Sequence, residues 1–215
     1  MNVEEIVPFF SDKWKQKYQA VLAEEHLKSI EENIAKFKDG LLNWDLPFFN
    51  EEIKPDRDKS FRLFLFILGS ESSAKKKAEQ LEEIPFEHWL NLLGQRLTSA
   101  SLRDEKAVPP FRKTLFEACE QPFNSEITIA QRAWEKHVGR RDDRFWGEVK
   151  GNNRQKQQVV MEKINYILDH KTWWNVFFHY KHGLVYEVRE AEGHGIRWSH
   201  NGTRLIGFLE IFIND

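Results

Sequence analysis

Cysteine is almost missing from this chain of 215 residues: Cys119 stands alone, so no disulfide can form within the chain. The apolar run that includes Phe64–Leu68 is far shorter than the roughly 20 residues of a membrane-spanning helix. The first residues also lack a basic segment followed by a long apolar one, which is the pattern of a secretory signal. We therefore expect a protein that works in a reducing, cytoplasmic setting without a membrane span.

A strong net charge is missing too. The 32 Lys and Arg residues oppose 34 Asp and Glu residues, which gives a net charge of −2. Composition alone therefore does not predict a basic surface for nucleic acid or for an anionic membrane.

Familiar catalytic and cofactor motifs are absent from the sequence. It contains no G-x-S-x-G elbow, no P-loop and no G-x-G-x-x-G, and Cys119 lies on an apolar helical face that favours an inert buried thiol. Many histidines fall late in the chain, but neither H-x-H nor H-E-x-x-H occurs. The sequence thus predicts no metal site and no cofactor, and it leaves the catalytic residues unassigned.

Aromatic residues, by contrast, are abundant. They make up 13% of the chain, with 17 Phe and 8 Trp. Because each buried ring removes roughly 150–250 Å² from water, a large core needs only some of them. A surplus of rings is typical of protein interfaces, so a protein partner is one expectation, although the simpler interpretation places the rings in the core.

Apolar residues recur at three- and four-residue spacing through most of the first 170 residues, which predicts helices. Ser11 and Ser125 are suited to cap two of them. The apolar run at 60–69 fits a buried strand or a buried helix, and we favour helix. The expected helices cover about 12–40, 60–69, 74–84, 85–97, 111–119, 125–139 and 154–170.

After Lys171 the apolar period changes from helical to alternating, which predicts strands. Asn201-Gly202 is a strong hairpin signal because both residue types tolerate positive φ. The expected strands lie within 172–181, 183–190, 195–199 and 203–212. We predict an α+β fold in which a helical portion, 1–170, packs on an antiparallel four-stranded meander, 171–215, as one compact domain.

The first candidate site is the sheet face turned away from the apolar residues. Alternation places Glu187, Arg189 and Arg197 on one face, joined by Asn175 and His179. Two guanidinium forks beside a wide aromatic residue suit a carboxylate or phosphate ligand, while paired charges on a solvated face are the competing interpretation. The aromatic residue in question is Trp198.

The second candidate is the stretch 136–156, where seven basic residues outnumber three acidic ones. Basic residues neutralise phosphates and a ring stacks on bases, so the stretch fits nucleic acid, unless its tryptophan only anchors a loop. The residues expected to bind are Arg140, Arg141, Arg144, Trp146 and Lys150.

Within the same stretch, Asp143 and Glu148-Val149-Lys150 form a pattern that is similar to the Asp…Glu-x-Lys arrangement of metal-dependent nucleases. Such a short pattern occurs by chance in a chain rich in Glu and Lys. The sequence therefore favours a binding or interaction module with an anion-binding sheet face. The alternative is an enzyme directed at nucleic acid or phosphate, such as a metal-dependent nuclease, that uses the 136–156 stretch.

Overall fold

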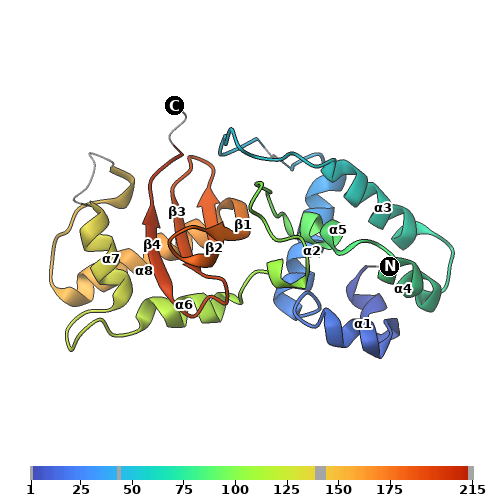
Figure 1. Cartoon of the computed structure of the whole chain (residues 1–215), viewed down its shortest axis with the longest axis horizontal. Helices are drawn as coiled ribbons and strands as arrows, with labels where there is room; N and C mark the ends of the chain where they lie inside the picture. Colours follow the sequence, from blue (N-terminus) through green and yellow to red (C-terminus); the bar gives the residue numbers. More distant parts are fainter. Residues whose placement is uncertain (1, 43–44, 139–143, 213–215) are drawn as a thin grey trace. The chain divides into compact units, whose positions relative to one another are not determined.

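The computed structural model describes residues 2–42, 45–138 and 144–212. The predicted α+β class is confirmed, because helices form the earlier part of the chain and an antiparallel sheet the later part (Figure 1). The chain divides into two compact units, residues 1–43 with 52–108 (unit 1) and residues 44–51 with 109–215 (unit 2). The expectation that residues 1–170 and 171–215 form one compact domain stays a prediction. In the described part of the chain, no helix combines the length and apolar character needed to span a bilayer.

Unit 1 is helical. The expected helix over 12–40 is instead two helices, because residues 18–23 form tight turns and the backbone oxygen of Ala20 bonds to His26 Nδ1 at 2.7 Å. Ser11 caps the first of them as predicted, and the apolar run at 60–69 is helical. The elements are η1 (Glu4–Phe9), α1 (Asp12–Lys17), α2 (Glu24–Lys38), α3 (Arg57–Gly69), α4 (Ala74–Glu82), α5 (Phe86–Leu93) and η2 (Glu105–Ala107).

The core of unit 1 is aromatic. Trp89 of α5 is fully buried, and its ring centroid lies 4.9 Å from that of Phe64, 5.2 Å from Trp14 and 5.9 Å from Phe10. Edge-on and tilted ring pairs of this kind add to the stabilisation that burial provides.

A buried ion triad accompanies this core. The Glu52 side chain is 1% exposed and accepts hydrogen bonds from Arg57 Nη2 at 2.7 Å and from Arg96 Nε at 2.8 Å. Burial alone would raise the pKa of Glu52, but the hydrogen bonds from Arg96 and Arg57 hold it below its ordinary value. The triad ties the start of the 52–108 segment to α3 and to the residues after α5.

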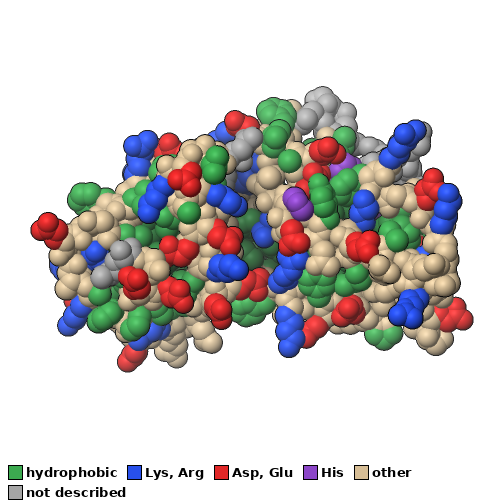
Figure 2. All heavy atoms as spheres, turned by 180° about the vertical axis from the view of Figure 1, so that it is seen from behind, with side chains coloured by type: hydrophobic (Ala, Val, Ile, Leu, Met, Phe, Trp, Pro, Cys, Tyr) green, Lys and Arg blue, Asp and Glu red, His purple; other side chains and the backbone are tan. Residues whose placement is uncertain are grey.

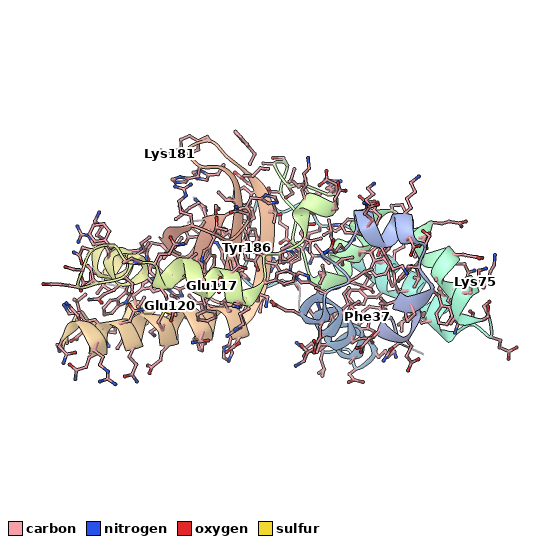
Figure 3. The ribbon with its side chains drawn as sticks, turned by 90° about the horizontal axis from the view of Figure 1, so that it is seen from below. Phe37, Lys75, Glu117, Glu120, Lys181 and Tyr186 are labelled. Atoms are coloured by element: carbon pink, nitrogen blue, oxygen red, sulfur yellow. The ribbon has the colours of Figure 1, made fainter. Side chains whose placement is uncertain are left out.

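Unit 2 contains the sheet, whose strand order β1-β2-β3-β4 confirms the predicted antiparallel meander. Helix α8 contacts β2 and β3, while α7 and α6 contact β4, so these helices cover the apolar face (Figures 1 and 3). The elements are α6 (Arg112–Glu120), α7 (Ile129–Val138), η3 (Arg144–Trp146), α8 (Asn153–Asp169), β1 (Lys171–His179), β2 (Gly183–Glu190), β3 (Gly195–Ser199) and β4 (Leu205–Leu209).

Two local expectations in unit 2 are wrong. Helix α7 begins at Ile129 and not at Ser125, because Asn124 Oδ1 accepts the N–H groups of the two residues after Ser125 and holds a turn there. Asn201 does not adopt positive φ, and only Gly202 does in the 200–204 connection, at +75°. The side-chain oxygen of Asn201 instead accepts bonds from Ser199 and Thr203, which makes a wider loop than a two-residue turn.

Gly202 gives a stability test. We expect Gly202→Ala to be more destabilising than Gly183→Ala, because both positions have φ near +70° but only a Cβ at Gly202 would lie 2.6 Å from a carbon of Pro110. The left-handed conformation costs about 1–2 kcal/mol in either variant, and the clash adds about 1–3 kcal/mol at Gly202. Urea unfolding measures both, and equal losses would show that the contact with Pro110 contributes nothing.

The ion triad gives a second test. We expect Glu52→Gln to destabilise unit 1 by about 3–5 kcal/mol, because it leaves two buried guanidinium groups without their carboxylate. Since the folded pKa of Glu52 is lowered, its contribution is fully present above the unfolded pKa of about 4.3 and is lost as pH falls through the folded value.

Thermal unfolding between pH 7 and pH 3 checks this dependence. Glu79→Gln is the matched control, because Glu79 pairs with Lys76 on the surface and its loss should cost less than about 1 kcal/mol. If the two variants unfold alike across this range, the triad does not stabilise unit 1.

Candidate functional site

The sheet face turned away from the helices brings together most of the predicted ligand-binding residues. Asn175, Glu187 and Arg197 oppose one another on β1, β2 and β3, and Arg189 lies two residues after Glu187 on the same face. Alternation along each strand produces this row.

The carboxylate of Glu187 joins the two arginines. Its Oε1 accepts from Arg189 Nε at 2.6 Å, and its Oε2 accepts from Arg197 Nε at 2.7 Å and Nη2 at 2.5 Å. The face was expected to be wet, but the side chains of Glu187 and Arg189 are only 2% and 7% exposed. Arg197 is more accessible, with 15% of its side chain exposed. The result is a rigid cationic pair centred on one buried carboxylate.

Aromatic rings and backbone oxygens fix Arg189 further. Its Nη1 donates to the carbonyl oxygens of Gly193 and Glu210 at 2.6 Å each, and its guanidinium lies 3.9 Å from the ring centroid of Phe212. Phe212 stacks on Phe49 at 4.3 Å, so the 44–51 segment reaches this side of the sheet. The 44–51 segment lies far from the strands in the sequence, so the burial of Glu187 and Arg189 could not be predicted from the strand pattern.

His179 ends β1 on the same face, near the β1–β2 hairpin. Its pKa is lowered by partial burial and then by the positive charge of Arg197, with smaller effects from His182 and Lys181, while Glu187 acts in the opposite direction. Its ring stacks on those of His182 and Tyr180, each at 4.9 Å. His179 is therefore neutral at pH 7, and its Nδ1 accepts the backbone N–H of Lys181 at 3.2 Å.

Trp198, predicted to lie beside the arginines, is on the opposite face. It pairs with Tyr186 across β2 and β3, its ring lies 6.2 Å from that of Tyr186, and it is fully buried. Cys119 is buried on this side as well, and burial raises the pKa of its thiol to about 12, so it is not a nucleophile at neutral pH. Both residues belong to the core between the sheet and its helices.

The second predicted site is described only in part. Arg140, Arg141 and Asp143 lie outside the described residues. Arg144 and Lys150 are exposed, and Lys150 forms an ion pair with Glu148 on a coil segment without a strand.

Trp146 is 1% exposed and packs inside unit 2. The Nε1 of Trp134 donates to its backbone oxygen at 2.9 Å, and its ring lies 5.0 Å from that of Phe208 and 4.8 Å from that of His137. A nucleotide base could stack on this ring only by displacing these contacts.

Beside Trp146, the structure places a cluster that sequence reasoning did not single out. Glu190, Glu192 and His194 bring their potential ligand atoms within 4.8 Å of one another in the β2–β3 turn. Glu190 Oε1 lies 3.0 Å from His194 Nδ1 and accepts the N–H of His194, while its Oε2 accepts the N–H of Glu192. The signal in the sequence that could have indicated this cluster is the close spacing of two glutamates and a histidine within five residues. The bonds show that the Glu190 carboxylate closes the turn.

Comparisons with known proteins find one family model that matches part of this unit. Residues 116–210, less than half of the chain, match the family model described as the CdiA C-terminal tRNase toxin domain. No curated protein matches the chain.

Among solved structures, the chain is similar to the toxic C-terminal tip of CdiA from Pseudomonas aeruginosa, determined in complex with its immune protein. The identity is 25%, the similarity covers 44% of this chain and 99% of the other, and the TM-score is 0.39. The family match shows that the expectation of a non-enzymatic binding module is wrong. The match to a tRNase toxin domain supports the alternative, an enzyme directed at nucleic acid, and it includes every strand of the sheet.

Proposed function

We propose that unit 2 cleaves RNA, with tRNA as the substrate, and that the cleavage site is the sheet face formed by Glu187, Arg189, Arg197 and His179. One observation carries this proposal: within the segment that matches a tRNase toxin domain, two guanidinium groups are fixed on one carboxylate. A protein partner and a cytoplasmic setting, both expected from the sequence, stay predictions.

The arginine pair suits a phosphodiester. A guanidinium group carries five N–H donors, and Glu187 accepts from the Nε and Nη2 of Arg197, so the Nη1 side of this group can bind a phosphate oxygen. Because Glu187 fixes the arginines before the substrate arrives, little reorganisation accompanies the growth of negative charge on the phosphate. Of the two arginines, Arg197 is the one that solvent reaches more easily.

His179 can transfer the proton. Its lowered pKa keeps the ring neutral at pH 7, with Nδ1 as the basic nitrogen. Once the substrate displaces the Lys181 N–H from Nδ1, this nitrogen can accept the proton of an attacking hydroxyl group. In RNA the 2′-hydroxyl is such a group, and DNA lacks it. The 2′-oxygen attacks phosphorus, and the bond from phosphorus to the 5′-oxygen breaks. The 5′-oxygen departs and takes up a proton, and a 2′,3′-cyclic phosphate remains on the other product.

The exposed cations of the 136–156 stretch add attraction at a distance. Arg144 and Lys150 lie within the matched segment. Figure 2 shows that basic and acidic side chains are interspersed over the face in view, so attraction to RNA depends on local clusters. In this proposal the stretch assists binding, and the sheet face performs the chemistry.

We expect Arg197→Lys to reduce tRNA cleavage by about 100-fold or more, because lysine keeps the charge but loses the planar fork. Single-turnover cleavage of tRNA measures the loss, and the melting temperature verifies folding. Arg62→Lys, at an exposed position of α3 in unit 1, is the matched control and should cleave like the wild type. Cleavage by Arg197→Lys within twofold of the wild type would contradict the assignment.

The cleavage rate should depend on pH through His179. The rate should be constant where the ring is neutral and should fall as pH drops through a pKa below the ordinary 6.5, because the protonated ring cannot accept a proton. His179→Ala should slow cleavage and remove this acidic limb. His170→Ala, after α8, should keep it. An unchanged limb in His179→Ala would rule out this role.

The mechanism also predicts which substrates resist cleavage. RNA with 2′-deoxy sugars should not be cut, and cleavage of ordinary tRNA should continue in EDTA with 2′,3′-cyclic phosphate ends. Cleavage that stops in EDTA, returns with Mg²⁺ and is lost in Glu148→Ala and Lys150→Ala would instead assign the chemistry to the Asp143, Glu148 and Lys150 pattern.

A further inference from the structure

The tip of the β1–β2 hairpin, residues 178–182, presents large rings to solvent. Phe178 is 60% exposed and Tyr180 is 78% exposed. Lys181 lies over the Tyr180 ring with its Nζ 5.4 Å from the centroid, and it projects from the side of the sheet away from α6 and α8 (Figure 3). Two exposed rings only two residues apart need an explanation, because neither contributes its full area to the core.

The tip is also electropositive. The pKa of His182 is lowered by burial and then by the charges of Arg197, Arg204 and Lys181. Arg197, His182 and Lys181 lower the pKa of His179 in the same way, and the acidic group that opposes them is Glu187, whose carboxylate already binds two guanidinium groups. An added negative charge would therefore be attracted to this end of the sheet.

A second exposed ring shows the contrast. Phe66 of α3 is 75% exposed, but the shallow groove beside it is lined by acidic and basic residues together. These neighbours are Asp56, Asp58, Lys59 and Arg62. The hairpin tip differs because its rings occur with positive charge, which is the combination that binds single-stranded nucleic acid.

We propose that the hairpin tip is the docking element for a single-stranded part of the RNA, whose bases stack on Phe178 and Tyr180 while its phosphates contact Lys181 and Arg204. This inference rests on the proposed function and deepens it. His179 belongs both to the tip and to the arginine face, while Phe178 lies on the other face with Val176. An RNA strand that stacks on Phe178 would therefore reach Arg197 around the end of β1. An unpaired loop fits the site, since paired bases do not expose their faces for stacking.

The test is the affinity for a 2′-O-methyl oligouridine of about 12 nucleotides, a length within the range that single-strand-binding modules cover. This probe has no free 2′-hydroxyl, so binding is measured apart from cleavage, by fluorescence anisotropy. Removing each ring should weaken binding about tenfold, the equivalent of about 1.4 kcal/mol, so Phe178→Ala with Tyr180→Ala should lose about 100-fold. Tyr180→Phe should keep the affinity, because phenylalanine still stacks.

The charged part is tested by salt. Lys181→Ala should reduce the slope of log affinity against log salt by about one, because one phosphate contact is lost. Lys75→Ala, at an exposed position of α4 in unit 1, is the matched control and should keep the slope. Phe66→Ala is the control for the rings and should bind within twofold of the wild type.

The outcomes separate the two proposals. The ring variant is the double variant Phe178→Ala with Tyr180→Ala. If it binds the probe as well as the wild type does, the docking role is wrong, even if tRNA is cleaved. Loss of probe binding in the ring variant supports it even if the Arg197→Lys variant cleaves normally and the proposed site fails. A ring variant with unchanged RNA affinity that no longer binds a protein partner would make the tip a protein-binding surface and overturn the inference.

Discussion

The arrangement of the candidate site depends on the carboxylate of Glu187. Without it, two guanidinium groups on neighbouring strands would repel each other in a largely buried place, where an unpaired charge is costly. With it, Arg189 and Arg197 are held in one fixed arrangement, and the backbone oxygens of Gly193 and Glu210 bind what remains of Arg189. The charged row thus stabilises the sheet and, in the proposed function, supplies prepared donors for a phosphate.

Much of the fold could be predicted because periodicity determines it. The switch from helical to alternating spacing after Lys171 falls at the first residue of β1, and the residues of α8 have the spacing of a helix that covers a sheet. The errors lie where single side chains bond to the backbone. His26 binds the backbone of the turn before α2, while Asn124 and Asn201 each organise a turn. Such bonds have no period that a sequence pattern could reveal.

The site could be predicted in part for the same reason. Alternation was enough to place Asn175, Glu187 and Arg197 in one row, since register follows from the buried face. Its burial could not be foreseen, because it involves Phe212 and a ring from a segment more than a hundred residues away. Trp146 shows the converse: the sequence places it among cations, but its contacts with Trp134 and Phe208 place it in the core.

The stacking of Phe49 on Phe212 means that unit 2 is discontinuous in the chain. Its sheet follows residue 108, yet Phe49, which stacks on the Phe212 ring beside Arg189, lies between the two segments of unit 1 in the sequence. A fragment excised at the beginning of the family-matching segment would leave Phe49 behind. The segments of the two units thus alternate along the polypeptide, so each unit folds from two pieces of sequence that a piece of the other separates.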